Sequence, residues 1–268
     1  MAKLRHDPIT AKDLEEFVGS DSDFAFEMQV LSQLRGAGFE CAHSGTYRDP
    51  VTDKIRQFDI RAVKHEGNLT LALAVECKNL RPNYPLLLSA VPRTTPESFH
   101  DLIVWERQSF PYPQSVRPVT GAASAYKPAE MVAKKTDQVG RDTSDGLVSD
   151  DQATFEKLNQ AVNSCRDLVQ DYLHESSPPL VRAIVPLLVV PPGLLWQVDY
   201  SADGNRVTGP RQVKHTSLFL KSAWSVDLGV GAMRSYRLSH IELVTLDALS
   251  ATVATYLGAG GFFAAVKG

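Results

Sequence analysis

The sequence has little cysteine and no long apolar run. Three cysteines occur among 268 residues, at Cys41, Cys77 and Cys165, without a CxxC pair or histidines at metal-ligand spacing. This number and spacing favour neither a disulfide framework nor a structural zinc site. No stretch reaches the roughly 18 apolar residues of a membrane helix, and the opening MAKLRHDPIT has no signal-peptide core. We therefore expect a cytoplasmic protein with no membrane association and with reduced, buried cysteines.

The sequence also lacks an excess of positive charge and any glycine-rich nucleotide loop. Its formal net charge is −3, with 28 Lys and Arg against 31 Asp and Glu. This balance excludes a strongly basic nucleic-acid coat, but it is compatible with an enzyme that holds metal ions with carboxylates. Because neither GxxxxGK[ST] nor GxGxxG occurs, nucleotide hydrolysis and dinucleotide chemistry are not expected. Any ATP-driven step would need a partner ATPase.

The composition is that of an ordinary globular protein, with 43% hydrophobic and 22% charged residues. No Gly/Ser-rich or charged linker interrupts the chain. We therefore predict a single domain over residues 1–268, with core motifs in residues 20–80, an insertion at about 80–125, and helices and added strands over about 126–268.

A helix is predicted over residues 22–35. The segment SDSDFAFEMQVLSQLRGAGF opens with residues suited to an N-cap and ends on Gly36 and Gly38, which suit a C-cap. At 100° per residue most apolar side chains fall on one arc, and Glu27 lies in the middle of it. A carboxylate there is costly to bury without compensation. Glu27 is therefore either an ion-paired or snorkelling core residue or a metal ligand.

Three strand-like segments follow, over residues 40–47, 56–63 and 69–77. The third is almost continuously apolar, which is typical of a central strand that is covered on both faces. The dipeptide Gly67-Asn68 lies between the second and third segments and is a favoured two-residue hairpin loop. The sequence therefore predicts an antiparallel hairpin over these two segments.

This turn sets the register of the hairpin and places Asp59 opposite Glu76. Directly opposed residues have Cβ atoms about 4.5–5.5 Å apart on one sheet face, where two carboxylates repel by about 3 kcal/mol at an effective dielectric near 20. Such a pair suggests a cation between the acids. Lys78 follows Glu76 by two residues, so the strand period predicts its side chain on the same face. The cluster is either a lysine that neutralises two acids or a metal site.

The helical Glu27, the segment KIRQFDIRA and the segment LALAVECKNL occur in an order that resembles the PD-(D/E)xK restriction-endonuclease-like superfamily, especially its Mrr-like and Holliday-resolvase-like members. The resemblance covers roughly residues 20–80. Phe58 stands where the family's namesake motif has proline. The resemblance implies a metal site whose ligands are Asp59, Glu76, Glu27 and the backbone carbonyl of Cys77. It also implies that Lys78 contacts the attacking water or the phosphate.

Carboxylate and carbonyl oxygens suit Mg²⁺ or Mn²⁺. The resemblance therefore implies a Mg²⁺-dependent DNA endonuclease that hydrolyses phosphodiester bonds with metal-activated water, in prokaryotic defence, restriction or DNA repair. Its partners would be DNA, a second copy in a homodimer, and an ATPase or another defence-system subunit. Two alternatives stay open. One is an RNase or junction resolvase with the same site, and the other is a catalytically inactive nuclease-fold subunit that binds nucleic acid or acts as a scaffold.

The middle of the chain is predicted as loops and helices. Residues 80–125 contain seven prolines, which indicates a long insertion near the mouth of the site, with a short helix at about 97–107. The segment KPAEMVAKKTDQVGR then predicts a helical zone. Several members of the superfamily place a Gln or Lys on the helix after the ExK motif, pointing into the active site, and Gln138 resembles that position, so the resemblance implies a catalytic role for it. The same zone carries the clearest basic patch, which is either a solvated helix face or a phosphate contact, and it consists of Lys127, Lys134, Lys135 and Arg141.

The remaining sequence predicts a long helix in DDQATFEKLNQAVNSCRDLVQDYLHE and then strands in LVRAIVPLLVVP, LLWQVDYS, VKHTSLFLKSAW and SYRLSHIELVTL, closed by a helix at about 247–257. His215 and His240 alternate within strands and are interpreted as sheet histidines with satisfied hydrogen bonds. The fold class expected is α/β, with a restriction-endonuclease-like α/β/α core, a mixed central sheet and extra C-terminal strands.

Overall fold

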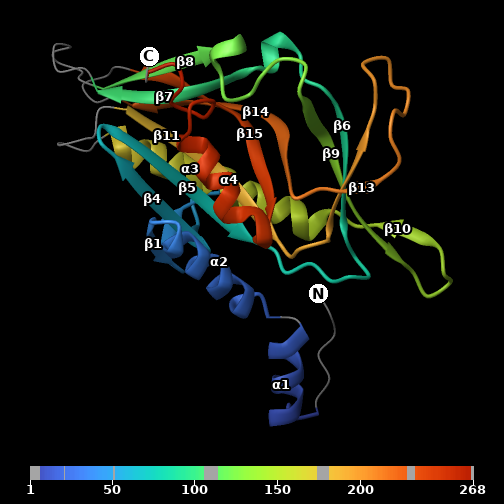
Figure 1. Ribbon diagram of the computed structural model, residues 1–268. Coiled ribbons are helices and arrows are strands. Elements are labelled where there is room, and N and C mark those ends of the chain that lie inside the picture. The colour runs from blue at the N-terminus through green and yellow to red at the C-terminus, as the bar shows by residue number, and fades with distance from the viewer. Residues whose placement is uncertain are drawn as a thin grey trace.

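The computed structural model describes residues 7–20, 22–50, 52–105, 114–173, 181–227 and 233–266. Within them the helices are α1 (Ala11–Ser20), α2 (Phe24–Gly36), α3 (Gln152–Leu173) and α4 (Leu249–Leu257). Figure 1 shows these helices around one large sheet, with α1 standing away from it. The strands are β1 (Glu40–His43), β2 (Thr46–Arg48), β3 (Ile55–Gln57), β4 (Ile60–Glu66), β5 (Leu69–Cys77), β6 (Leu86–Pro92), β7 (Phe99–Trp105), β8 (Gln114–Thr120), β9 (Met131–Arg141), β10 (Leu147–Ser149), β11 (Val181–Val190), β12 (Leu195–Asp199), β13 (Arg211–Gln212), β14 (His215–Asp227) and β15 (Met233–Thr245).

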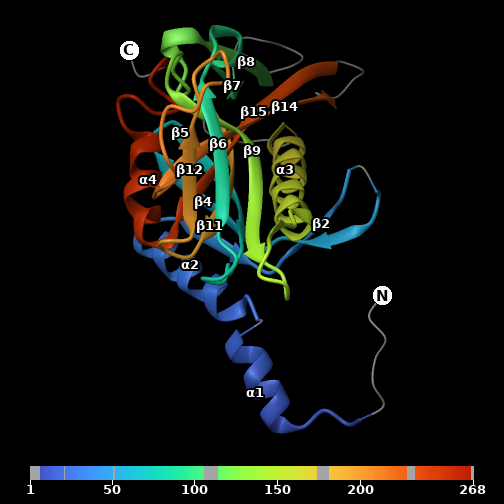
Figure 2. The same ribbon diagram turned by 90° about the vertical axis from the view of Figure 1, so that its right-hand side faces the viewer.

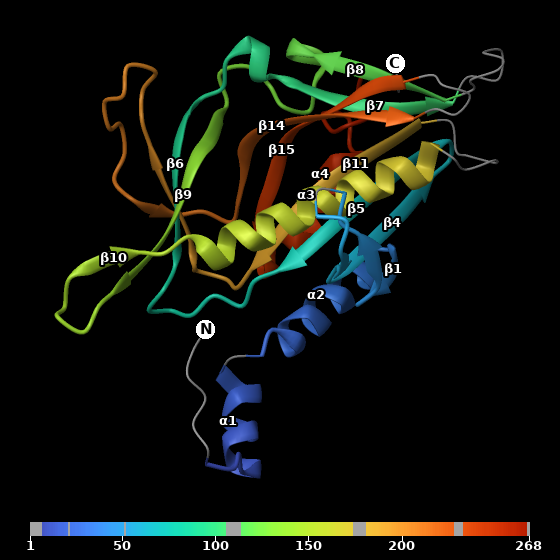
Figure 3. The same ribbon diagram turned by 180° about the vertical axis from the view of Figure 1, so that it is seen from behind.

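The large sheet is mixed and lies between helices. Its main path runs β1-β4-β5-β11-β15-β14-β9-β6-β12-β13, with β10 paired to β9, and β7 to β11 and β8. β4 and β5 are antiparallel, whereas β5, β11 and β15 are parallel neighbours. α3 packs on one face of the central strands, and α2 and α4 pack together on the other. Figures 2 and 3 show these layers from the side and from behind. The central strands thus form an α/β/α arrangement.

The side chains of β5 alternate between two different environments. Its larger side chains point toward α2 and α4, whereas its small ones face α3 and let that helix approach closely. The first set is Leu71, Leu73, Val75 and Cys77, and the second is Ala72 and Ala74. Glu76 continues the second set, so its carboxyl group points toward α3.

Much of the predicted framework is confirmed. The helix near 22–35, the strand at 69–77, the long helix of residues 152–173, the C-terminal strands and the closing helix are all present. Of the predicted apolar arc of α2, four side chains are buried, while Phe24 and Met28 are exposed. The protein is therefore of the α/β class with a large mixed sheet. Among the helices that the structure describes, none is long and apolar enough to cross a membrane.

The prediction for residues 80–141 was wrong. β6, β7 and β8 lie within the expected loop insertion, and the helix expected at 97–107 is β7, which pairs with β8. The expected helical zone is β9, which pairs antiparallel with β6. Lys and Ala favour a helix in an isolated segment, but strand pairing satisfies the backbone hydrogen bonds of β9 and overrides that preference.

The segment predicted as one strand over 40–47 is interrupted at Ser44 and Gly45. Ser44 has a φ of 55°, which turns the chain from β1 into β2. A Cβ atom at Gly45 would lie 2.4 Å from the ring of Phe58, so only glycine allows this close approach. The interruption brings Phe58 and the following Asp59 against the turn after β1, where the Ser44 amide donates to the Asp59 carbonyl at 2.9 Å.

Candidate active site

The β4–β5 hairpin brings Asp59 and Glu76 together, as predicted from the turn. Glu66 faces Leu69 and Ile60 faces Val75, so the register is the expected one, with Asp59 just before β4. Both acids lie on the face covered by α3. Asp59 Oδ2 accepts a 2.8 Å hydrogen bond from the Cys77 amide, which anchors this side chain to the end of β5.

The cation between the two acids comes from α3. Lys157 Nζ donates to Asp59 Oδ2 at 2.7 Å and to Glu76 Oε2 at 3.1 Å. Burial alone would lower the pKa of Lys157, but the Glu76 and Asp59 carboxylates outweigh it and raise that pKa. Lys157 is therefore a permanent ammonium ion, and it offsets the repulsion that the register creates.

Of the three side chains in this cluster, the Glu76 carboxyl group has the least favourable electrostatic surroundings. Its side chain is 1% exposed, and burial followed by the nearby Asp59 raises the pKa of its carboxyl to about 8, despite Lys157. Within the described parts of the chain, no donor lies within hydrogen-bond distance of Glu76 Oε1. A buried carboxylate oxygen without a partner costs free energy, so the site is suited to a further cation or to a proton.

The sequence prediction did not include Lys157 in the site. The helical periodicity of residues 152–173 nevertheless indicates that Lys157 faces the core. Lys157 follows the buried Thr154 by three residues and precedes the buried Ala161 by four, so it lies on the core-facing side of α3. A lysine at such a position needs a partner acid. The prediction assigned the superfamily's helical Gln or Lys to Gln138 because it expected a helix there. In the described part of the chain the first α-helix after the ExK segment is α3, which carries Lys157.

Gln138 belongs to β9 and is held by structural contacts. Its Nε2 donates to the Tyr84 carbonyl at 3.2 Å, and its Oε1 accepts from Thr154 Oγ1 at 2.8 Å. The side chain therefore links the segment before β6 to the start of α3. Its catalytic role stays a prediction, although it does line a cavity of about 270 Å³ together with Lys78.

Lys78 follows the last residue of β5. Its amide donates to the Val189 carbonyl at 2.9 Å, which continues the β5–β11 ladder by one residue. Among the residues that the structure describes, its ammonium group is not within ion-pair distance of Asp59 or Glu76, so Lys157 rather than Lys78 bridges them. Lys78 instead lines the cavity that opens at this end of β5. Its predicted contact with water or phosphate remains a prediction.

Glu27 lies near this end of the sheet but has its own partner. Its Oε2 is 3.0 Å from His43 Nε2, and its side chain is 15% exposed. Glu27 and Asp59 both raise the pKa of the Cys77 thiol, after burial, so Glu27 acts electrostatically on the same strand end. The ion-paired interpretation of Glu27 fits this geometry, while its support of a metal cluster stays a prediction.

The oxygen atoms of this cluster could supply some, but not all, of the ligands that a hard divalent cation needs. Asp59 and Glu76 supply carboxylate oxygens, the ligand type that Mg²⁺ and Mn²⁺ prefer, and Glu76 Oε1 has no hydrogen-bond donor among the described residues. The Cys77 thiol stays protonated because burial raises its pKa, so only its backbone carbonyl could serve as a ligand. In the parts of the chain with described coordinates, no three His, Cys, Asp or Glu side chains are grouped around one metal position. Water and substrate oxygens would complete such a site, as is usual for Mg²⁺.

The predicted basic patch lies along β9 and its flanks. Lys134 pairs with Glu97, Lys135 with Asp137, and the Lys127 ammonium donates to the Ala122 carbonyl. Arg141 contacts Asp145 at 3.8 Å. Because three of these four cations already face carboxylates, their charge is largely compensated, which favours the solvated-surface interpretation over a phosphate-binding stripe.

Replacing Lys157 by methionine is expected to lower the free energy of unfolding by about 3 kcal/mol at pH 8 in EDTA, because the buried Asp59 carboxylate and the Glu76 carboxyl group lose the cation that they share. Mg²⁺ or Mn²⁺ should then stabilise the variant more than it stabilises the wild type, since the ammonium no longer competes for Asp59 and Glu76. Thermal unfolding with and without each metal measures both effects.

The matched control is Lys214→Met. Lys214 also pairs with one acid, Asp247, at 2.8 Å, but its side chain is 74% exposed, so its loss should change stability by less than about 1 kcal/mol. If metal ions shift both variants equally, the two carboxylates do not take a divalent cation in place of the ammonium.

Comparisons of the chain with protein-family models, with curated proteins and with solved structures found no match.

Proposed function

We propose that the chain hydrolyses phosphodiester bonds in DNA at the Asp59–Glu76–Lys157 cluster, with Mg²⁺ or Mn²⁺ as cofactor. The observation that carries the proposal is Glu76 Oε1, which has no partner among the described residues and lies beside Asp59 on a hairpin whose register forces two acids together. A purely structural ion pair would not need the second acid or the open oxygen. The order of Glu27, Asp59, Glu76 and Lys78, which resembles that of PD-(D/E)xK nucleases, supports the same chemistry, although the resemblance assigns the role of the lysine to Lys78 and not to Lys157.

The roles of the residues follow from their positions. Asp59 and Glu76 would hold the metal ion, with Asp59 oriented by the Cys77 amide. When bound, the ion would polarise the phosphate and lower the pKa of a water molecule. Lys157 would turn from the two carboxylates toward the phosphate and neutralise charge that develops there. Lys78, two residues after Glu76, and Gln138 line the cavity of about 270 Å³ at the end of β5, where a nucleotide next to the reacting phosphate would lie.

The decisive experiment is a cleavage matrix. Supercoiled DNA, linear DNA, single-stranded DNA and RNA are each incubated with the protein in Mg²⁺, Mn²⁺ or EDTA. We expect nicking or linearisation of DNA with either metal and no reaction in EDTA. Cleavage of RNA alone would identify a ribonuclease with the same site, and preference for branched DNA, added as a further substrate, would identify a junction resolvase.

An inactive scaffold is the alternative that one observation favours. Lys157 already bridges both acids and neutralises the Asp59 carboxylate while Glu76 is protonated, so the cluster is self-sufficient if no metal enters. In that case no substrate is cleaved, and Mg²⁺ leaves the melting temperature unchanged. Metal-dependent stabilisation of the wild type together with cleavage excludes this alternative.

A further inference from the structure

A second buried acid, Glu242, lies on the opposite face of the sheet from Glu76. On β11, Leu188 pairs with Glu76 and its neighbour Leu187 pairs with Glu242. Successive residues of a strand point to opposite faces, so the two acids face α3 and α4 respectively. Contact between Glu242 and Tyr256 of α4 agrees with this placement. The surroundings of Glu242 are therefore separate from the proposed active site.

The two carboxylate oxygens of Glu242 differ in the hydrogen bonds that they accept. Oε2 accepts hydrogen bonds from His215 Nε2 at 2.5 Å, from Ser217 Oγ at 3.1 Å and from the Tyr256 hydroxyl at 3.4 Å. Burial opposes ionisation, but the His215 hydrogen bond outweighs it and lowers the pKa of Glu242, so the group is a carboxylate. The nearby Tyr126 hydroxyl also favours the ionised form. Considering only the residues with described coordinates, no donor makes a well-formed hydrogen bond to Oε1, although the side chain is 2% exposed.

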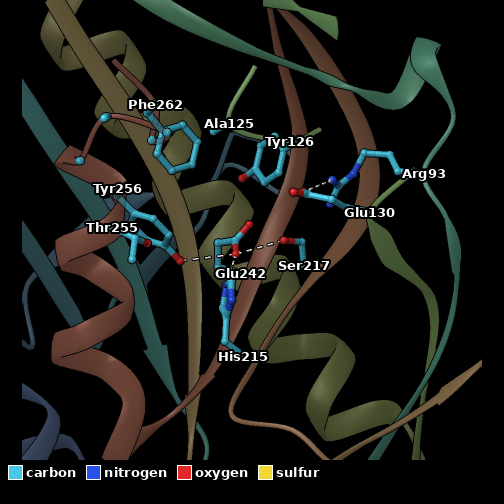
Figure 4. A pocket seen from close by; sticks show the side chains of 14 residues that line it. Arg93, Ala125, Tyr126, Glu130, His215, Ser217, Glu242, Thr255, Tyr256 and Phe262 are labelled. Atoms are coloured by element: carbon cyan, nitrogen blue, oxygen red, sulfur yellow. Dashed lines mark hydrogen bonds and ion pairs between the residues drawn. The ribbon is translucent and has the colours of Figure 1, made fainter. Parts of the chain in front are cut away.

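This carboxylate borders a cavity of about 450 Å³, which is within the size range of small-molecule sites. Figure 4 shows Tyr126, Tyr256 and Phe262 around the carboxylate end of Glu242. The Phe262 ring lies 5.6 Å from Tyr126 and 5.2 Å from Tyr256, edge-on to both. The backbone of residues 258–261 completes the wall. A buried negative oxygen is thus set among three aromatic rings.

The cations that line this cavity are already engaged. Arg93 Nη1 donates to the Lys127 carbonyl at 2.9 Å and to Glu130 Oε2 at 3.3 Å, and its Nε donates to His240 at 3.1 Å. His215 is committed to the other oxygen of Glu242. His215 thus compensates much of the Glu242 charge, while within the described lining Glu242 Oε1 stays open as a hydrogen-bond acceptor.

A metal ion matches this site less well than the Asp59–Glu76 pair, because Mg²⁺ and Ca²⁺ favour several carboxylate oxygens and the other acid of this lining, Glu130, is paired with Arg93. An ammonium group needs one acceptor and gains from nearby aromatic rings through cation–π attraction. We propose that this cavity binds a small organic ammonium ion with an apolar body, whose N–H donates to Glu242 Oε1 and whose body lies among Tyr126, Tyr256 and Phe262.

Three probes of nearly one shape test this proposal on the wild-type protein. Benzylammonium carries charge and N–H donors, benzyltrimethylammonium carries charge alone, and benzyl alcohol carries no charge. Titration calorimetry or ligand-observed NMR gives each affinity. We expect benzylammonium to bind at least tenfold more tightly than benzyl alcohol, with benzyltrimethylammonium in between. Equal affinities of all three, or no binding of benzylammonium at about 10 mM, would overturn the proposal.

Two variants locate the binding. Glu242→Gln should weaken benzylammonium at least tenfold and leave benzyl alcohol unchanged, because the shape is kept and the charge is lost. Ala125→Leu places extra volume in the cavity wall and should weaken all three probes. Melting temperatures without probe report folding, and if Glu242→Gln does not fold, the three-probe comparison and Ala125→Leu still decide. Unchanged benzylammonium affinity in a folded variant of either kind contradicts the assignment.

Discussion

Replacing Asp59 by asparagine is expected to reduce metal-dependent DNA cleavage on the order of 10³-fold or more, which corresponds to about 4 kcal/mol of lost transition-state stabilisation. The new side chain keeps an oxygen that can accept from the Cys77 amide and from Lys157, the two contacts that Asp59 makes at 2.8 and 2.7 Å. The fold should therefore survive while the negative charge for the metal is lost. Initial cleavage rates of supercoiled DNA in Mg²⁺ measure the effect.

The matched control is Asp53→Asn. Asp53 is an exposed turn residue with a φ of 57°, a conformation that asparagine adopts readily. The Asp53→Asn variant should cleave DNA at the wild-type rate. The Mg²⁺-induced rise in melting temperature should likewise disappear in Asp59→Asn and persist in Asp53→Asn. Wild-type cleavage by the Asp59 variant would remove this residue from the proposed chemistry.

Replacing Glu76 by glutamine is expected to abolish cleavage and at the same time to stabilise the metal-free protein at alkaline pH by about 2 kcal/mol or more. In the wild type, burial and Asp59 raise the pKa of Glu76 from 4.5 to about 8. Above that pH the folded protein must hold two neighbouring carboxylates out of water. An amide removes one charge and can donate a hydrogen bond to Asp59, as the protonated Glu76 does.

The direction of the pH dependence follows from proton binding. Between pH 4.5 and about 8 the folded state keeps the Glu76 proton while the unfolded state has released it. Stability of the wild type therefore falls as pH rises through this window, and the Glu76 contribution becomes constant above it. The glutamine variant lacks this decrease, so the two proteins should differ little near pH 4.5 and most above pH 8. Denaturant unfolding in EDTA at about pH 5, 7 and 9 measures the difference.

Glu156→Gln is the control for this experiment. Glu156 neighbours Lys157 on α3 but is exposed, and its Oε1 accepts a hydrogen bond from Gln152 Nε2 at 3.2 Å on the solvent side of the helix. The substitution should leave both the pH dependence and the cleavage rate unchanged. If Glu76→Gln is destabilising at alkaline pH, the Glu76 carboxylate contributes to the fold rather than burdening it, and it does not hold an open metal position.

In the proposed mechanism the ionised Glu76 lowers stability at alkaline pH while it holds the metal ion. Proteins accept such costs where charged groups must be held ready for a ligand. A divalent cation would offset the cost, so the wild type should regain in Mg²⁺ much of the stability that Glu76→Gln gains without it.

Secondary structure and strand register could be predicted from the sequence where a short segment alone determines them. The Gly67-Asn68 turn and the strand period of two placed Asp59 against Glu76, and the apolar stripe of residues 152–173 predicted α3. Prediction failed for β7 and β9, whose segments form strands only because β8 and β6 pair with them. The sequence of residues 131–141 does not indicate which segment of the chain will pair with it.

The sequence by itself thus determined that two acids face each other at the end of a buried hairpin, because turn type and alternation act over a few residues. Only the tertiary structure decided which cation pairs with these two acids. Lys157 lies 81 residues from Glu76 along the chain, and it reaches the acids because Ala72 and Ala74 let α3 pack closely on that face of β5. On the opposite face, β14, β15, α4 and the segment after α4 together line the cavity around Glu242. Contacts between distant elements depend on which surfaces fit together, and periodicity within one element does not encode that choice.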